Sequence, residues 1–383
     1  MSTVIISPVN VVNFLEGGGH FWVYMQYVQG LRRLGCEVYW LENFRSSGDE
    51  EQDAAALSTF AERMQAYGLG SKLILSISRE PQGTSGLPAE YVGLTRSEAE
   101  AIFDQADLLL NFHYAMDPAL LSRFRRTALV DIDPGLLQFW MSRGQLAVHR
   151  HDYYFTTGET VGTPDALFPD CGLPWIHIRP VVCLDQWPYL YDPNCEAFTT
   201  VSNWNTADWV RDGEELYDNT KRAAFLPFAE LPHLTNQTLE LALYLSDADE
   251  EDRCVLEHQG WRVCHSLDVT RTPEMYRLYI QRSRGELSCA KPSCMKFQNA
   301  WVSDRTLCYL ASGKPVVVQN TGPSSFLPNG EGMFRFSTPG EAADALATIN
   351  ADYEQHCQAA RQIAEAYFDT RPILERILGI VHK

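Results

Sequence analysis

The stretch LEGGGHFWVYMQYVQGLRRLGCEVYWLE, residues 15–42, decides the fold of this chain. It follows TVIISPVN (3–10), a β-branched run with a proline near its end, which predicts a buried strand. After the three glycines, apolar residues recur at helical spacing, namely Phe21, Tyr24, Met25, Val28 and Leu31. Gly35 is placed to end this helix, and CEVYWLE (36–42) predicts a second strand. The stretch is therefore a β–loop–α–β unit, and its loop lies where open α/β sheets bind ligands.

The glycine loop has three interpretations. As a dinucleotide-binding loop, it places Gly17 and Gly19 in the first half of a G-x-G-x-x-G pattern, and Glu42 has the spacing of a ribose-binding acid. The third glycine position is Trp22, however, which blocks the close helix–strand packing that this pattern needs. Alternatively, the glycines only make a tight turn, or they hold His20 at the mouth of another kind of site.

Composition narrows the class of protein. The chain has 383 residues, enough for two domains, and is 45% hydrophobic without a run approaching the ~20 apolar residues of a membrane span. The N-terminus does not resemble a signal peptide, and the ten cysteines show no paired spacing, so we expect reduced thiols and a cytoplasmic protein. A net charge of −18 argues against a nucleic-acid partner but leaves room for a local basic pocket.

Strand-like and helix-like segments alternate along the chain and predict an α/β protein. In the first half, strands are predicted at 72–78, 107–113, 127–133 and 152–158, and helices near 50–67, 96–105 and 117–125. A stretch rich in proline and aromatic residues follows at 168–195. In the second half, strands are predicted at 197–203, 239–245, 261–266, 285–290, 314–320 and 332–336, and helices near 214–224, 247–259, 273–283, 303–312 and 339–349. We expect two Rossmann-like, doubly wound domains that face each other.

The second half carries the more specific pattern, GELSCAKPSCMKFQNAWVSDRTLCYLASGKPVVVQNTGPSSFLPNGEGMFRFSTPGEAADAL, residues 285–346. Ser303 is placed as the N-cap of a helix with Asp304 in its first turn, and Gly313 ends that helix. Backbone N–H groups at a helix start favour a diphosphate, and so does a sharp turn such as Thr321-Gly322. The pattern therefore predicts an anion site in the second domain.

This order of elements resembles the donor half of GT-B glycosyltransferases, in which a helix precedes the phrase small-Gly-x-Pro-Val-Val beside the nucleotide-sugar diphosphate. GGGHFWVYMQYVQGLRRLGCEVYWLE (17–42) is similar to the start of their acceptor domain. The resemblance implies an acceptor-side domain at 1–186, a nucleotide-sugar donor domain at 187–366, and a C-terminal helix at 367–383 that returns to the first domain. The glutamates seven residues apart of many retaining members are absent, and so is the His-containing, glutamine-rich box of plant-type members.

The resemblance also suggests roles for individual residues. His20 lies where inverting members carry the base that removes the acceptor proton, and Asp131 and Asp133 are its candidate orienting partners, with Asp117 a weaker choice. For the donor we expect contacts from Gly18, Gly19, His113, Glu286, Lys291, Ser303, Asp304, Arg305, Thr321 and Gly322. Each of these has a structural alternative: His20 as a helix-start residue, the aspartates as turn caps, and the lone cations as solvated surface charges.

We thus expect transfer of a sugar from a nucleotide-sugar to a hydroxyl-bearing small-molecule or saccharide acceptor, with inversion. The histidines, cysteines and acids lack the spacing of a metal site, so neither a metal nor a cofactor beyond the nucleotide-sugar co-substrate is expected. Two alternatives remain open. A nucleotide-sugar epimerase on the same frame would turn over donor without acceptor. A non-catalytic nucleotide-sugar-binding protein would bind the donor nucleotide but show neither transfer nor hydrolysis.

Overall fold

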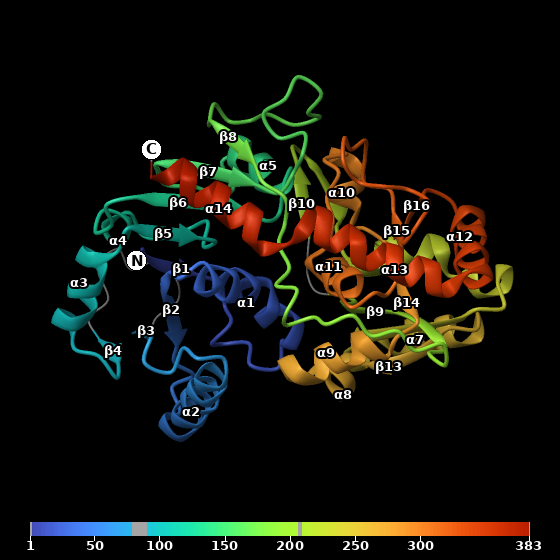
Figure 1. Ribbon diagram of the computed structural model, residues 1–383, viewed down its shortest axis with the longest axis horizontal. Helices are drawn as coiled ribbons and strands as arrows, with labels where there is room; N and C mark the ends of the chain where they lie inside the picture. Colours follow the sequence, from blue (N-terminus) through green and yellow to red (C-terminus); the bar gives the residue numbers. More distant parts are fainter. Residues whose placement is uncertain (1, 79–89, 206–208, 383) are drawn as a thin grey trace.

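The computed structural model describes residues 2–78, 90–205 and 209–382, and two sheets stand beside each other in it (Figure 1). The first sheet has eight strands in the order β4-β3-β2-β1-β5-β6-β7-β8. All neighbours in it are parallel except β3 and β4. Its strands are β1 (Thr3–Ser7), β2 (Glu37–Arg45), β3 (Leu73–Ser78), β4 (Tyr91–Val92), β5 (Leu108–Asn111), β6 (Thr127–Asp131), β7 (Tyr153–Thr156) and β8 (Trp175–His177).

The second sheet has six parallel strands in the order β13-β12-β9-β14-β15-β16. They are β9 (Ala197–Asn203), β12 (Thr238–Tyr244), β13 (Arg262–His265), β14 (Gly285–Ser288), β15 (Val316–Gln319) and β16 (Met333–Phe336). In both sheets the chain builds outward from a central strand in one direction and then in the other, which is the Rossmann strand order. The reversal lies between β1 and β5 in the first sheet and between β9 and β14 in the second. The predicted α/β fold class is confirmed.

Alternating side chains of the first sheet bury its two faces under different helices. Val4, Ile6 and Trp40 point to the face that α1 (Gly18–Arg33) and α2 (Glu50–Ala66) cover. Ile5, Leu41 and Ile74 point to the opposite face, which α3 (Arg96–Gln105) and α4 (Pro118–Leu121) cover. Between β6 and β7 lies the short helix α5 (Leu136–Ser142).

The second sheet is covered in the same way. One face packs against α6 (Lys221–Phe225), α7 (Glu250–His258) and α12 (Pro339–Ala351). The other packs against α9 (Pro273–Arg282), α11 (Asp304–Ala311) and α13 (Tyr353–Ile363), whose apolar residues belong to the same continuous core as those of α1. The remaining helices are α8 (Ser266–Thr270) and α10 (Pro292–Phe297). One apolar core therefore runs from the first domain into the second.

The chain crosses between the domains twice, and the two crossings lie side by side. On the way out, the Val182 amide donates to the Phe368 carbonyl at 2.8 Å. On the way back, the Thr370 amide donates to the Val182 carbonyl at 3.3 Å, and α14 (Thr370–Val381) then packs on α1 (Figure 1). The predicted C-terminal helix that returns to the first domain is thus confirmed, whereas the domain boundaries at 186 and 366 stay a prediction.

The helix predicted near 214–224 is wrong over most of its length. Residues 209–218 form an antiparallel hairpin of β10 (Trp209–Asp212) and β11 (Glu215–Asp218), and only α6 follows it. The hairpin turns at Gly213, whose φ of +66° is easily reached only by glycine. The Asp-Gly pair at 212–213 is a strong hairpin signal that the helical interpretation overlooked. Among the described residues, none of the helices has the length and apolar character needed to cross a membrane.

Candidate active site between the two domains

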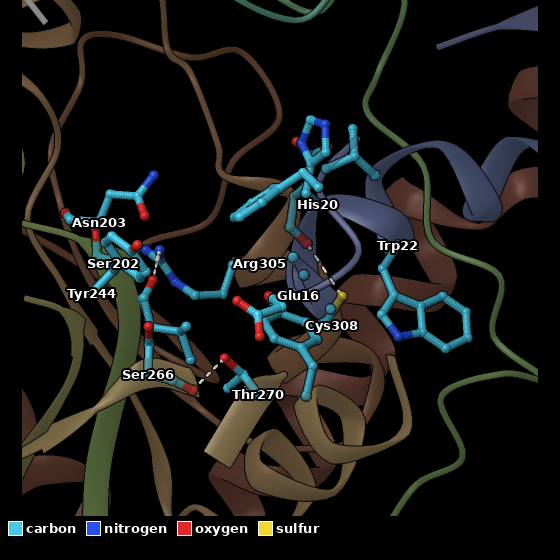
Figure 2. A pocket seen from close by; sticks show the side chains of 18 of the residues that line it. Glu16, His20, Trp22, Ser202, Asn203, Tyr244, Ser266, Thr270, Arg305 and Cys308 are labelled. Atoms are coloured by element: carbon cyan, nitrogen blue, oxygen red, sulfur yellow. Dashed lines mark hydrogen bonds between the residues drawn. The ribbon is translucent and has the colours of Figure 1, made fainter. Parts of the chain in front are cut away.

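A cavity of about 280 Å³ lies between the domains, at the carboxyl ends of the central strands (Figure 2). The start of α1 forms its first-domain side. The second domain contributes the ends of β9 and β12 and the starts of α8 and α11. Open α/β sheets bind ligands at this position, where the strand order reverses. The lining residues include Gly17, Gly18, Gly19, His20, Ser202, Asn203, Tyr244, Ser266, Ser303, Asp304 and Arg305.

Two helix N-termini converge on this cavity, one from each domain. Helix α1 starts after Gly17 and has no acidic residue in its first turn. Helix α11 starts after Ser303, whose hydroxyl caps the Arg305 amide at 3.3 Å. The first N–H groups of a helix lack intrahelical acceptors, and the helix dipole places partial positive charge there. The cavity therefore suits an anionic group such as a diphosphate.

Two of the three glycines allow the domains to meet. A Cβ atom on Gly18 would lie 2.4 Å from the carbonyl oxygens of Thr270 and Thr272, both in the second domain. A Cβ on Gly19 would lie 2.7 Å from the Tyr276 ring, also in the second domain. Trp22, at the third glycine position, is buried, and its indole N–H donates to the Pro273 carbonyl at 2.9 Å. The glycine pattern thus serves close packing between α1 and α8–α9.

The dinucleotide interpretation of this loop also needs Glu42 to bind a ribose, and that part of it is wrong. Glu42 is 5% exposed and does not reach the cavity. Its carboxylate accepts hydrogen bonds from the Val11 and Val12 amides at 2.5 and 3.1 Å and from the Trp40 indole at 2.9 Å. An acid used in this way holds the protein's own backbone and not a ribose.

His20 lies on the first-domain side of the cavity (Figure 2). Its Nε2 lies 2.6 Å from the carbonyl oxygen of Val9. Because a carbonyl only accepts hydrogen bonds, Nε2 carries the proton and the lone pair of the neutral ring is on Nδ1. Burial lowers the pKa of His20, and this outweighs the Val9 carbonyl and the charge of Asp133, which raise it. The ring is therefore neutral near pH 7, as a general base must be.

The two aspartates predicted as partners of His20 lie in different environments. Asp131 is fully buried, and its carboxylate accepts from Gln138 and Thr156, both at 2.8 Å, and from the Asp133 amide at 3.0 Å. His20 is not among these partners, so Asp131 orders the turn after β6. Asp133 is exposed, accepts from the Tyr114 hydroxyl at 3.1 Å, and acts on His20 through its charge.

Glu286 and Arg305, both predicted to contact the donor, are paired with each other. The Arg305 Nε donates to Glu286 at 2.8 Å, while its other nitrogens donate to the Val201 carbonyl at 2.8 Å and the Ser288 hydroxyl at 2.5 Å. Glu286 is 0% exposed. Arg305 lines the cavity with its guanidinium group held by these three partners, and its contact with the diphosphate stays a prediction. Removing either partner would leave the other as an unpaired buried charge, at a cost of about 3–5 kcal/mol.

Asp304 is a carboxyl group in the cavity wall, in the first turn of α11. Burial, together with the charge of Asp133, raises its pKa to about 7, although its own backbone amide and Arg305 oppose the shift. Close to neutral pH the group is therefore partly protonated. In that form it donates a hydrogen bond to an oxygen atom of a bound molecule, which a carboxylate cannot do.

The other predicted donor residues surround the cavity without lining it. The Thr321 hydroxyl donates to the Trp301 carbonyl at 2.8 Å, and a Cβ on Gly322 would lie 2.5 Å from the Gln298 carbonyl. This turn therefore supports the segment that leads into α11. Lys291 is the residue before α10, and His113 is half-buried after β5, where burial lowers its pKa.

Sequence reasoning missed a buried lysine near this site. Lys221 is 8% exposed, and its ammonium group donates to the Cys289 carbonyl beyond the end of β14. Burial lowers its pKa to about 7, and the charges of Arg305 and Lys291 add to this effect. Beside it, the Asn219 side chain is fully buried and caps the Ser293 amide at 2.8 Å. The only signal in the sequence was a Thr-Lys pair at the start of a short helix.

Two Rossmann-like domains that face each other across a cavity, joined by a C-terminal helix that crosses back, define the GT-B fold. Solved structures that resemble this chain over its full length have this fold. An α-glucosyltransferase bound to UDP-glucose and DNA aligns with a TM-score of 0.59, 12% identity and 100% of both chains covered. HepE from Anabaena with UDP-glucose gives 0.58, 13% and 100% of both chains.

Sucrose-phosphate synthase from Thermosynechococcus elongatus aligns with a TM-score of 0.57 and 11% identity over 100% of this chain and 98% of its own. By sequence, no protein family and no curated protein matches this chain. At these identities the likeness shows the fold, and the predicted GT-B resemblance is confirmed at that level. Within the described residues, no three His, Cys, Asp or Glu side chains gather as a metal site would require.

Proposed function

We propose that this protein is a glycosyltransferase that moves a sugar from a nucleotide-sugar donor to a hydroxyl-bearing acceptor, with inversion and without a metal ion. The observation that carries the proposal is the interdomain cavity with two helix N-termini and a neutral histidine in its wall. The helix ends suit a diphosphate, and the histidine suits the removal of a hydroxyl proton. The structural neighbours support the donor class, because two of them hold UDP-glucose.

On the donor side, the leaving nucleoside diphosphate lies against the start of α11. The backbone N–H groups there offset the negative charge that develops as the sugar departs. Protonated Asp304 donates to a donor oxygen from the same turn. These groups do the work that a divalent cation does in metal-dependent enzymes.

On the acceptor side, His20 Nδ1 takes the proton from the acceptor hydroxyl as that oxygen attacks the anomeric carbon. A new carbon–oxygen bond forms while the bond from that carbon to the phosphate oxygen breaks. His20 and α11 belong to opposite walls of the cavity. This arrangement favours attack from the side opposite the leaving group, which inverts the anomeric centre.

The acceptor in this proposal is a saccharide or small molecule, and the reaction takes place in the cytoplasm. One structural neighbour holds DNA in addition to UDP-glucose. A net charge of −18 repels a polyanion, so we expect no nucleic-acid acceptor for this chain.

The first experiment identifies the donor. Thermal shift with UDP, GDP, TDP and CMP selects the nucleotide, because a ligand that binds the native state raises Tm. The matching nucleotide-sugars are then incubated with a mixed panel of sugar and phenol acceptors, with and without EDTA. We expect an acceptor-dependent product with an inverted anomeric centre by NMR, formed at the same rate in EDTA.

Other results would favour the alternatives. Conversion of the donor sugar without acceptor would identify an epimerase, and nucleotide binding without any turnover would identify a binding protein. Transfer with retained configuration would keep the transferase but overturn the role of His20 as a base. Loss of transfer in EDTA would overturn metal independence.

A further inference from the structure

Glu42 is a buried glutamate that lies behind the β1–α1 connection, whose Val9 carbonyl contacts His20. Glu42 is near the end of β2, and its carboxylate holds three hydrogen-bond donors: the Val11 amide, the Val12 amide and the Trp40 indole. The cavity does not touch it. A buried carboxylate is costly unless its oxygens are bonded, so three donors on one carboxylate indicate a site that is built for an acid.

The segment that Glu42 holds is the connection from β1 to α1. Val9 and Val11 are separated by Asn10, whose φ of +57° turns the chain sharply. On one side of this turn the Val11 amide bonds to Glu42 at 2.5 Å, and on the other the Val9 carbonyl bonds to His20 at 2.6 Å. The position of the Val9 oxygen therefore depends on the Glu42 contacts.

We propose that Glu42 is the positioning residue of the site: by fixing the Val9–Val12 turn, it keeps the His20 proton on Nε2 and presents Nδ1 as the base. This inference rests on the proposed function, since it assigns a role to the catalytic histidine. Many catalytic histidines are oriented by a carboxylate that contacts the ring directly. Here the carboxylate acts on the ring through one turn of backbone.

Glutamine cannot replace Glu42 fully. All three partners are N–H donors, whereas an amide offers one oxygen and a second group that also donates. With its oxygen toward Val11 and Val12, glutamine faces the Trp40 indole N–H with its own NH2 group, so two of the three contacts remain and the turn is held less firmly. We therefore expect Glu42→Gln to be milder than Glu42→Ala. Trp40→Phe removes the same indole contact, with the added effect of a smaller ring in the core, and should loosen the turn as Glu42→Gln does.

The test observes the His20 ring directly. In the full-length protein labelled with ¹⁵N-histidine, long-range ¹H–¹⁵N spectra give the tautomer of each histidine, and His20→Gln identifies the His20 signals. We expect the Nε2–H tautomer in the wild type. In Glu42→Ala we expect a mixture of tautomers and a His20 pKa that moves up toward its ordinary value of about 6.5, because the loosened turn admits water.

Activity gives the second readout. In Glu42→Ala, the ascending limb of kcat/KM against pH should move with the His20 pKa. A positioned base contributes roughly two to four orders of magnitude to kcat, and we expect this variant to lose roughly one to two of them. The charged and titratable neighbours of His20 stay in place, namely Tyr24, Asp133, Asp304 and Arg305. Phe103→Leu is the control, because Phe103 is buried on the opposite face of the same sheet.

The outcomes separate this inference from the proposed function. Absence of transferase activity in the wild type would overturn the function, while the NMR arm would still test the turn. An Nδ1–H tautomer in the wild type would overturn the inference. So would an unchanged tautomer and pKa in folded Glu42→Ala or, if that variant does not fold, in both Glu42→Gln and Trp40→Phe.

Discussion

His20 is held by a backbone carbonyl, whereas many catalytic histidines are held by a carboxylate. A carboxylate partner stabilises the imidazolium that forms when a histidine accepts a proton, whereas a neutral carbonyl does so more weakly. The charge of Asp133 supplies part of that stabilisation from outside hydrogen-bond contact. The result is a weak base, kept neutral by burial, which suits a substrate hydroxyl that becomes acidic only as it attacks.

Replacing this histidine should therefore remove turnover without removing the donor. We expect His20→Ala to lower kcat by roughly two to four orders of magnitude. Calorimetry with the donor nucleotide should give nearly the wild-type Kd, because the proposed diphosphate site is at the start of α11. His258→Ala, at an exposed histidine of the second domain, is the control. A His20→Ala variant with near-normal kcat would exclude a base at this position.

If the donor binds as proposed, Asp304 should make its binding depend on pH. Its pKa in the free protein is raised to about 7. A diphosphate in the same cavity disfavours the carboxylate and raises that pKa further, so binding takes up a proton. Affinity for a nucleotide-sugar should then fall as pH rises above 7, by at most about tenfold per pH unit.

Two measurements check the pH dependence. Calorimetry at pH 7.5 in buffers of different ionisation enthalpy should show proton uptake on donor binding. Asp304→Asn should abolish that uptake and bind the donor more tightly than wild type at pH 8. If wild type and Asp304→Asn take up the same number of protons on donor binding, this carboxyl does not lie beside the bound diphosphate.

At the scale of the element, the start of α1 packs directly against the second domain. Gly18 lies against two carbonyl oxygens of the α8–α9 connection, and no side chain fits there. The contact brings the α1 N-terminus into the same cavity as the α11 N-terminus. Gly18 therefore affects ligand binding through the relative position of the two helices, one in each domain.

A single methyl group at Gly18 should disturb this arrangement. In Gly18→Ala the new Cβ would lie 2.4 Å from backbone oxygens, so the domains must shift, at a cost of about 1–3 kcal/mol. We expect a lower Tm and weaker donor binding, with far-UV circular dichroism unchanged. Gly340→Ala is the matched control, because it also lies in the first turn of a helix and has nothing within 4 Å. Equal stabilities of the two variants would contradict the role of Gly18.

The sequence predicted the elements better than the contacts between them. The apolar spacing of Phe21 to Leu31 and the β-branched strands reflect burial inside one domain, which leaves a local pattern. The pairing of Glu286 with Arg305, or of Gly18 with Thr270, exists only because distant segments are brought together by the fold. The hairpin at 209–218 was missed although its Asp-Gly turn is local, since Glu214, Glu215 and Leu216 also suit a helix.

At the scale of the whole molecule, the C-terminal helix belongs to the first domain although the chain reaches it last. Ile373, Leu374, Ile377 and Val381 are buried in the core that contains α1. A Cβ on Gly30 of α1 would lie 2.5 Å from Leu374, so the two helices are in close contact. A first half that lacks this helix would expose the apolar face of α1 to water. We therefore expect residues 1–186 to need residues 367–383 in order to fold.

A chain rearrangement tests this dependence. Val182 and Asp369 already pair in the parallel direction, so a flexible linker of roughly ten Gly and Ser residues should join 186 to 367 without strain. Burial of four large apolar side chains is worth about 6–12 kcal/mol, comparable to the whole stability of a domain. We expect residues 1–186 alone to lack a cooperative urea transition and the fusion to 367–383 to regain one. The same fusion with Leu374→Ala and Ile377→Ala should lose it again, because those substitutions remove the packing and keep the helix. If 1–186 alone unfolds cooperatively at the same urea concentration as the fusion, the first domain is complete without its returning helix, and the helix serves only to hold the two domains together.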